Sequence, residues 1–336
     1  MKRALKRAAL AVLNAGPVYR TLRARVLGKG ALTVLCYHTL RGDNEDLDAW
    51  LALRMRDFRA QVDFLRRNYD IVSLDEALEP PAPAARPRVV LTFDDGERGL
   101  HDHLLPYVEA EGLPVTVYVA TGQIESATPY WFDRVMNALQ GPGPIRIDLR
   151  ADGLSSWRVG PERGRTRWLT ISTILGALKT VPPGRRAHLA DKVIAQAEAA
   201  GAAGAAGAAT TGFTPLAPMT RDQLGELAAS RHVTIGGHSH CHNLLDQLPL
   251  AEASASIARS RALLQEWTGQ PVRHFAYPNG NHTRELMAEI ARLGFASATI
   301  LDDRLAMPGA DPLALSRIGI GRYDALPRFR LRLLDL

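Results

Sequence analysis

The sequence contains little cysteine, few aromatic residues, and no apolar run near its start that is long enough to cross a bilayer. Cys36 and Cys241 are the only cysteines among 336 residues, which excludes a disulfide framework and a zinc site made of cysteines. Aromatic residues make up 6% of the chain, and the aromatic–basic motif of a nucleic-acid module is absent. The apolar run over residues 8–13 is too short to span a membrane.

Acidic residues are also in the minority. The chain has 35 Asp and Glu against 41 Lys and Arg, which gives a net charge of +6 and a pI of about 9.5. Such a balance favours contact with anionic surfaces, but without a recognisable nucleic-acid motif we expect no nucleic-acid partner. A composition of 46% hydrophobic and 23% charged residues is ordinary for a globular protein, and the length allows one large barrel-like domain or two smaller ones.

Residues 1–30 form a basic N-terminal segment. The apolar run in it resembles the start of a signal peptide, but Asn14 and Pro17 interrupt it and more arginines follow. Two interpretations fit equally well: an amphipathic helix lying on an anionic membrane, and a solvated basic helix packed on the domain. The unconvincing signal peptide and the basic chain ends favour peripheral contact with an anionic membrane and a location in the cytoplasm or at the cytoplasmic face of a membrane, with export as the alternative.

Hydrophobic periodicity predicts strands that alternate with helices. Strands are expected over 31–38, 71–74, 89–93, 115–120, 233–237, 272–277 and 295–300, and helices over 55–68, 104–112, 220–229, 252–268 and 284–293. This repetition predicts an α/β fold with a parallel, barrel-like sheet.

Residues 137–214 differ from the rest and predict an insertion in a barrel domain that covers residues 31–336. Proline and glycine punctuate the segment, residues 185–200 are expected to be helical, and the alanine–glycine stretch over 199–209 indicates a flexible tether or poor helix. The insertion is either a lid or substrate-shaping arm, or a spacer with no part in the chemistry.

The chain is organised around the strand over residues 89–93, which leads directly into Asp94, Asp95 and Gly96. Two adjacent carboxylates at the end of a buried strand repel each other and lose solvation, a cost that a bound cation or a proton-transfer role would offset. On this motif alone an ordinary Asp-Gly turn is an equally good interpretation. The strand over residues 31–37 ends in the same manner at His38, and in barrels the chemistry lies at this end of the strands.

Three histidines stand within five positions at 238–242. His238 and His242 are four residues apart and would share one face of a helical turn. Together with a distant carboxylate they make a three-ligand metal site with open positions, for which zinc suits best and other divalent ions are alternatives. His240 lies two residues from each ligand and is expected to point away from the metal.

Three motifs, in this order along the chain, resemble those of the polysaccharide deacetylases (carbohydrate esterase family 4, the NodB-homology group). They are Thr92-Phe93-Asp94-Asp95-Gly96, His238-Ser239-His240-Cys241-His242 and Arg273-His274-Phe275-Ala276-Tyr277-Pro278, and the resemblance covers residues 31–136 and 215–322. It implies a distorted, incomplete (β/α) barrel with a largely helical insertion. The early Tyr37-His38 pair, without a later Leu-x-His motif, resembles the branch of the poly-N-acetylglucosamine deacetylases.

The resemblance also implies roles for the site residues. Asp94 is the base that takes a proton from the water attacking the acetyl carbonyl, and Arg273 pairs with Asp94 and holds it in place. His38 protonates the departing amine, a step that an unperturbed histidine pKa near 6.5 suits. The metal ligands that the resemblance implies are Asp95, His238 and His242.

Three further residues are assigned to the substrate. The backbone N–H of Asn279 would bind the oxyanion, although tyrosine or phenylalanine is common at this position in the family and the side-chain wall is therefore different. Tyr277 precedes the same proline and is counted with this site. Trp131 belongs to an aromatic cluster over residues 129–133 that is either core or a platform for sugar rings.

The sequence therefore predicts a metal-dependent hydrolase that removes N-acetyl or O-acetyl groups from an acetylated carbohydrate of an exopolysaccharide, a cell wall or a lipid-linked glycan. The alternative is a catalytically inactive glycan- or membrane-binding protein of the same fold. Other metalloenzymes lack their motifs: Ser239 stands where a zincin needs glutamate, the Pro-Cys-x-x-Cys run of a zinc deaminase is absent, and no carboxylate lies two residues after His238 as in an iron oxygenase.

Overall fold

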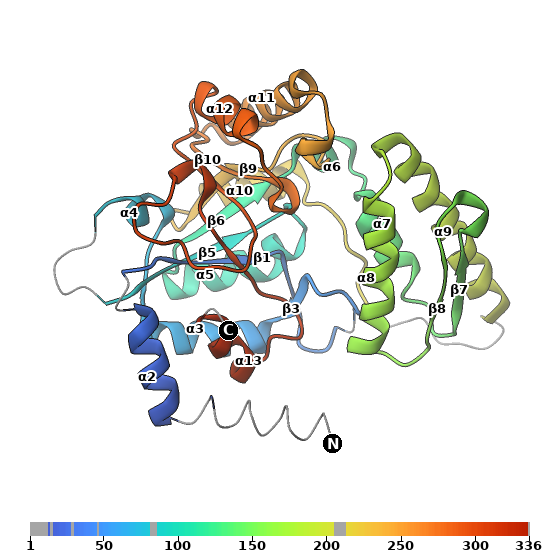
Figure 1. The fold of residues 1–336 in the computed structure, drawn as a ribbon, viewed down its shortest axis with the longest axis horizontal. Coiled ribbons are helices and arrows are strands. Elements are labelled where there is room, and N and C mark those ends of the chain that lie inside the picture. The colour runs from blue at the N-terminus through green and yellow to red at the C-terminus, as the bar shows by residue number, and fades with distance from the viewer. Residues whose placement is uncertain are drawn as a thin grey trace.

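The computed structural model describes residue 13 and residues 16–27, 30–45, 47–80, 86–204 and 213–334. At its centre is a sheet of eight parallel strands in the order β11-β10-β9-β6-β5-β1-β12, with β4 paired to the start of β5 (Figure 1). The strands are β1 (Thr33–Tyr37), β4 (Asp70–Ile71), β5 (Arg88–Phe93), β6 (Val115–Val119), β9 (Val233–Gly237), β10 (His274–Ala276), β11 (Ser297–Thr299) and β12 (Ile318–Gly319).

Burial explains why this sheet is parallel. The central strands β1, β5 and β6 are buried at nearly every residue, as expected when a sheet is covered on both faces. Leu35 and Leu91 face the main hydrophobic core, whereas their neighbours Val34 and Val90 belong to a smaller apolar cluster on the opposite face. The sheet curls into a half-barrel that ends at β11 and β12, so the predicted distorted, incomplete (β/α) barrel is confirmed.

Helices surround this half-barrel. They are α3 (Met55–Asn68), α4 (Leu74–Leu78), α5 (Leu105–Glu111) preceded by the π-helical turn η1 (Leu100–Leu104), α6 (Thr121–Ser126), α10 (Arg221–Ala229), α11 (Leu250–Thr268), α12 (Arg284–Arg292) and α13 (Leu326–Arg332). Short 3-10 turns stand at η3 (Leu245–Gln247), η4 (Pro278–Gly280) and η5 (Pro312–Ala314). In η1, His101 bridges two carboxylates, with ring nitrogens 2.9 Å from Asp102 and 2.9 Å from Glu226 of α10.

Most predicted elements are confirmed. α3 has the expected bounds, and α10 begins at a capping box made by Thr220 and Gln223. The predicted strand over 71–74 is wrong after Ile71, because Ser73 and Glu76 form a capping box that starts α4 at Leu74. The short parallel pair β2 (Thr39–Arg41) and β3 (Ala52–Arg54) was not predicted.

The predicted insertion forms most of a second hydrophobic cluster beside the half-barrel (Figure 1, right). It contains the hairpin β7 (Ile145–Asp148) and β8 (Ser156–Val159), the turn η2 (Arg150–Asp152), and the helices α8 (Arg165–Lys179) and α9 (Pro183–Gly204), which pack with α7 (Trp131–Ala138). The expected helix over 185–200 is confirmed within α9, which runs on through the alanine–glycine stretch as far as Gly204. The rest of that stretch, residues 205–209, lies outside the described residues.

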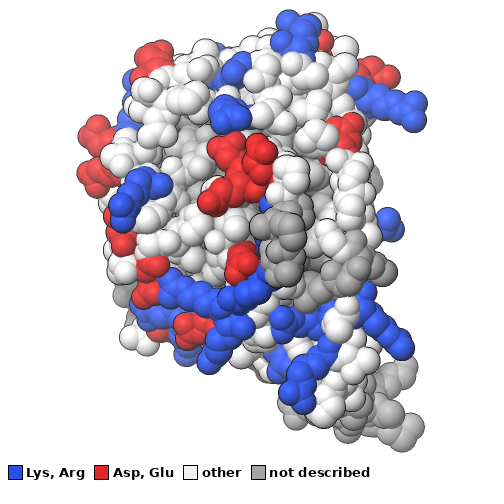
Figure 2. Space-filling view, turned by 90° about the vertical axis from the view of Figure 1, so that its left-hand side faces the viewer, with Lys and Arg blue, Asp and Glu red and all other residues white. Residues whose placement is uncertain are grey.

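The two ends of the described chain pack together. Helix α2 (Gly16–Leu27) buries Tyr19 against Leu331 and Leu334, and the Arg330 guanidinium lies 4.0 Å from the centre of the Tyr19 ring. Residues 16–27 are therefore a helix packed on the domain, while residues 1–12 of the predicted basic segment lie outside the described residues. Figure 2 shows lysine and arginine side chains gathered on the lower part of the face near α2. Within the described residues, no helix has the length and apolar character that crossing a membrane would require.

Candidate active site

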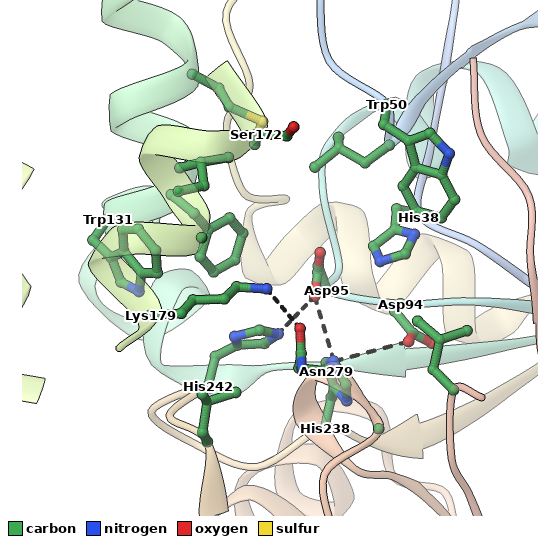
Figure 3. Close-up of a pocket in the computed structure, with 18 of the residues that line it drawn as sticks. His38, Trp50, Asp94, Asp95, Trp131, Ser172, Lys179, His238, His242 and Asn279 are labelled. Atoms are coloured by element: carbon green, nitrogen blue, oxygen red, sulfur yellow. Dashed lines mark hydrogen bonds and ion pairs between the residues drawn. The ribbon is translucent and has the colours of Figure 1, made fainter. Parts of the chain in front are cut away.

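Three parallel strands carry the predicted site residues to one end of the half-barrel. His38 follows β1, Asp94 and Asp95 follow β5, and His238 follows β9. Parallel strands end at the same edge of a sheet, and the four side chains accordingly line one pocket (Figure 3).

Asp95, His238 and His242 form a compact set of donors. Oδ1 of Asp95 lies 3.0 Å from Nε2 of His242 and 3.4 Å from Nε2 of His238. One ligand atom from each residue can be chosen so that all three lie within 4.8 Å of one another. Nδ1 of His238 lies 2.7 Å from the carbonyl oxygen of Ala276 and donates to it, which leaves the Nε2 lone pair directed at Asp95.

These three residues fit a divalent cation. Oδ1 of Asp95 is buried and faces two imidazoles, but it forms a hydrogen bond with neither. A buried carboxylate oxygen without a partner is costly unless a cation binds to it. A neighbouring cluster of Cys36, His38 and Asp94 is equally tight but fits less well. Burial raises the pKa of the Cys36 thiol, so it stays protonated, and Arg317 already neutralises Asp94.

The pKa shifts of Asp95 and His242 agree with metal binding, whereas that of His238 does not: burial lowers the pKa of His238, but the carboxylates of Asp94 and Asp95 outweigh burial and raise it. Burial alone would favour a protonated Asp95, but the adjacent His242 and His238 outweigh it and hold the pKa of Asp95 well below its usual range. Burial lowers the pKa of His242 despite the attraction of Asp95, and the ammonium group of Lys179 acts in the same direction as burial. His242 is therefore a neutral imidazole at neutral pH, which is the form that binds metals.

The histidine motif is a loop and not the helical turn that we predicted. Residues 238–242 follow β9 without forming a helix, and Ser239 and His242 have φ values of 61° and 50°. Asp95 has a φ of 76°, so three residues of the site lie in the left-handed region that side chains other than glycine seldom adopt. This backbone brings the rings of His238 and His242 to a centroid separation of 4.8 Å, a convergence that sequence spacing alone does not provide.

Asp94 is paired with a buried arginine that sequence reasoning missed. Nη1 and Nη2 of Arg317 donate to the two carboxylate oxygens at 2.6 and 2.7 Å, and Nη1 also donates to Oγ1 of Thr92 at 3.0 Å. Burial favours the neutral acid, but the Arg317 guanidinium outweighs it and keeps the pKa of Asp94 below its ordinary value. Arg317 directly precedes β12, and a strand of two residues is too short to show a period in the sequence.

Arg273, which the resemblance assigned to this pairing, lies elsewhere, and that prediction is wrong. It directly precedes β10 and reaches Oδ1 of Asp75 in α4 at 3.3 Å, with more than half of its side chain exposed. Asp94 follows β5, at the opposite end of the parallel strands. Figure 1 shows α4 on the left of the sheet and α8, which lines the pocket, on the right.

His38 lines the pocket beside Trp50, with ring centroids 5.5 Å apart. Its Nδ1 is buried and makes no hydrogen bond to the protein. Burial lowers the pKa of His38 below its ordinary value, although Asp95 and Asp94 act in the opposite direction. The expectation of an unperturbed pKa is therefore wrong, because the ring is held in a desolvated position.

The pocket walls are largely aromatic and apolar, and several come from the insertion. Trp131 lines the pocket and also packs against the second hydrophobic cluster, with the Arg186 guanidinium 5.6 Å from its ring centre. Asn279 also lines it, and its side-chain oxygen accepts a hydrogen bond of 2.6 Å from the ammonium group of Lys179. The insertion residues that line the pocket come mainly from α8, and they are Trp168, Ser172, Leu175, Gly176, Lys179 and Arg186.

Two predicted neighbours of the site point away from it. The side chain of Tyr277 packs against Phe275 and donates to the carbonyl oxygen of Leu313 at 3.2 Å, so it does not line the pocket and its assignment to the substrate site is wrong. His240 turns away from the metal ligands, as expected, with Nδ1 2.9 Å from Oγ1 of Thr121.

Comparison with known proteins agrees with this geometry. A family model described as polysaccharide deacetylase matches residues 82–147 and 197–298, together half of the chain. No significant match exists among curated proteins.

Several solved structures share the fold. The deacetylase PplD of Streptococcus pyogenes in complex with acetate is 16% identical, with a TM-score of 0.56, over 90% of this chain and 98% of its own. IcaB of Ammonifex degensii is 19% identical, with a TM-score of 0.55, and the match covers 90% of this chain and 97% of IcaB. A de-N-acetylase of Aggregatibacter actinomycetemcomitans is 14% identical, with a TM-score of 0.53, and the match covers 90% of this chain and 99% of that enzyme. With the family motifs assembled at one end of a matching half-barrel, this chain belongs to the polysaccharide deacetylase family and is a carbohydrate deacetylase.

Proposed function

We propose that the protein hydrolyses N-acetyl groups from amino sugars of a glycan in a metal-dependent reaction. The observation that carries this proposal is the convergence of Asp94, His38 and the donor set of Asp95, His238 and His242 in one pocket. The three residues of the donor set would hold the ion. A bound divalent cation, most suitably zinc, polarises the acetyl carbonyl and lowers the pKa of water.

Asp94 acts as the general base. Arg317 keeps its carboxylate ionised and holds both oxygens in a fixed plane, so the group is ready to take a proton from the attacking water. Because Arg317 makes two further hydrogen bonds, to Thr92 and to the carbonyl oxygen of Ile300, the base cannot rotate without breaking a buried network.

His38 acts as the acid at the departing nitrogen. Its lowered pKa makes it neutral at neutral pH, so it must gain a proton before it can donate one. A ring nitrogen of His38 and a carboxylate oxygen of Asp94 lie within 4.8 Å of each other. An atom hydrogen-bonded to both could bridge this separation, so the proton that Asp94 takes from water can pass on to His38. In net terms water adds to the acetyl carbon, the C–N bond breaks, and the amine nitrogen receives the proton.

The pocket walls support a sugar substrate. Four aromatic residues line the cavity, Trp50, Trp131, Phe132 and Trp168, and aromatic faces stack on the apolar faces of sugar rings. Together with the Tyr37-His38 pair at the end of β1, this favours N-acetylglucosamine units of an exopolysaccharide over O-acetylated, cell-wall or lipid-linked sugars.

The test is acetate release from N-acetylglucosamine oligomers, with and without a chelator and again after zinc is added. Release that the chelator stops and zinc restores is the expected result. O-acetylated and lipid-linked substrates assayed in parallel identify the preferred class. If zinc is bound and none of these substrates releases acetate, the catalytically inactive glycan-binding alternative replaces the proposal.

We also propose peripheral contact with an anionic membrane, at its cytoplasmic face, through the basic surface around α2. Exposed Arg20 and Arg25 lie on this helix, and the lower part of the face in Figure 2 is rich in basic side chains. The full chain should sediment with vesicles containing anionic lipid and remain in solution with neutral vesicles or at high salt. A cleaved N-terminus found in the periplasm would contradict this location.

A further inference from the structure

The predicted insertion reaches the active site through one face of α8. Trp168, Ser172, Leu175, Gly176 and Lys179 line the pocket, and their spacing is that of a single helix face. Lys179 is the last residue of the helix, and Figure 3 shows its side chain directed across the pocket at Asn279, beside His242.

A second basic residue holds the end of α8 in place. Arg186 is 2% exposed and donates to the carbonyl oxygens of Leu178 and Val181 at 3.1 and 3.0 Å. It also donates to Oε1 of Gln247 in η3 at 2.8 Å, which ties the insertion to the segment after the histidine motif. Lys179 therefore projects from a helix end that is anchored on both sides.

The partner of Lys179 begins a chain of hydrogen bonds between active-site loops. Nζ of Lys179 donates to Oδ1 of Asn279 at 2.6 Å, and Nδ2 of Asn279 donates to Oδ1 of Asn281 at 2.7 Å. Nδ2 of Asn281 then donates to Asp246 at 2.8 Å. Asn279 itself has a φ of 59° within η4, in the left-handed region that asparagine adopts more readily than most residues other than glycine.

The position of Lys179 is otherwise unfavourable. The residue is partly buried and lines the pocket together with the three candidate metal ligands, where a bound cation would repel its ammonium group. Among the described residues no carboxylate lies within ion-pair distance of it, and its ammonium group donates a hydrogen bond to the neutral amide of Asn279. A cation kept there at such a cost indicates a role in the site.

We propose that Lys179 is a positioning residue that holds the loop of Asn279, so that the backbone N–H of Asn279 faces the oxyanion formed at the acetyl carbonyl. Lys179 and Asn279 line the same pocket, and their side chains are joined by the 2.6 Å hydrogen bond. The inference rests on the proposed function, and it makes the insertion a working part of the active site.

The experiment compares Lys179→Met with Lys192→Met in the full, zinc-loaded protein. Lys192 is a matched control because it also lies in the insertion and its ammonium makes a 2.6 Å contact, to Asp152, away from the pocket. Removing an oxyanion donor costs about 100- to 1,000-fold in kcat, so misplacing one through Lys179→Met should cost about 10- to 100-fold, with KM changed less than about threefold. Lys192→Met should act like wild type. A rise in KM with unchanged kcat would mean that Lys179 binds substrate instead, and would overturn the proposal.

A double-mutant cycle with Asn279→Ala tests the pairing. If Lys179 acts through Asn279, Lys179→Met should have little further effect on kcat once Asn279 is alanine, whereas independent effects that multiply would contradict the inference.

Hydrogen exchange separates this inference from the proposed function, because it needs no turnover. The amides of Gly280 and Asn281 bond to the carbonyl oxygens of Tyr277 and Pro278 within the loop, and Lys179→Met should speed their exchange while Lys192→Met does not. Faster exchange in a protein that releases no acetate would leave the positioning intact and reject the proposed function. Unchanged exchange would overturn the positioning whatever the activity.

Discussion

Replacing Arg317 by methionine removes the charge that compensates a buried carboxylate, and it should impair both folding and catalysis. Arg317 is 0% exposed and Asp94 3% exposed, and they share two hydrogen bonds of 2.6 and 2.7 Å. Breaking a buried pair by removing one partner typically costs about 3–5 kcal/mol, because the other charge stays buried and unpaired. We expect the free energy of unfolding of Arg317→Met to fall by about that amount at neutral pH.

The loss should depend on pH with a definite sign. In the wild type the pKa of Asp94 is lowered, so its pairing stabilises the protein above the unfolded pKa of about 4, and that stability is lost as the pH falls through the folded value. In Arg317→Met, burial without a partner raises the pKa, so the ionised group destabilises the fold at higher pH. The difference between the two proteins should therefore shrink near pH 4 and below.

The matched control is Arg273→Met, since the family motif names this residue but the structure gives it a solvent-exposed partner, Asp75. Urea unfolding should show a change below about 0.5 kcal/mol for this variant. Acetate release should fall at least about 100-fold in Arg317→Met, because a general base contributes on that scale, and should stay near wild type in Arg273→Met. The added change Asp94→Asn should restore part of the stability of Arg317→Met. The opposite ranking of the two arginine variants would refute the reasoning.

Three further predictions concern the remaining site and one distant histidine. Asp95→Ala and His238→Ala should each abolish metal retention, measured by elemental analysis after purification with zinc, and full occupancy in either would contradict the ligand assignment. Asp94→Asn should keep its metal and lose acetate release, and turnover at the wild-type rate would mean that another group is the base. His101→Gln should lower the melting temperature more at about pH 5.5 than at about pH 8.5. Partial burial opposes the charged form of His101, but its hydrogen bonds to two carboxylates outweigh burial and raise its pKa. The stabilisation is therefore present below the pKa of the unfolded state and is lost as the pH rises through the pKa of the folded state. Equal losses at both pH values would exclude this linkage.

The fold and the strand ends that carry the candidate metal ligands were predictable because their signals are local. A buried strand that ends in Asp94 and Asp95 fixes where these side chains lie once the sheet is parallel, since the carboxyl ends of the strands share an edge. His238 reaches the same edge by the same rule, at the end of β9. The route taken by His242 was less accessible, because it depends on the left-handed φ of Ser239, and spacing alone suggested a helix.

Arg317 shows where local signals end. The strand register places Ile318 opposite Leu35, and Leu35 opposite Leu91. The backbone of Arg317 therefore lies nearer the amino ends of the strands than Asp94, and only its long side chain reaches the carboxylate. The parallel fold predicted from the sequence already argued against Arg273, which stands at the start of its strand. A motif match and a topology prediction were in conflict, and the topology was correct because it follows from burial along whole strands.

Helix α8 of the predicted insertion was missed for a different physical reason. α8 buries Arg167 and exposes Leu169, and the face that lines the pocket mixes aromatic, small and charged residues. Its pattern therefore lacks the contrast between an apolar and a charged face that reveals a helix in a sequence. Gly176 illustrates this, because a glycine within a helix costs about 1 kcal/mol relative to alanine and indicates a break. Here a side chain at Gly176 would meet no atom within 4 Å, and the residue borders the pocket. The absence of a side chain at Gly176 leaves open space in the cavity. A residue that argues against a helix in the sequence therefore contributes to the shape of the site. This contribution depends on the pocket beside α8, so it cannot be derived from the sequence of the segment alone.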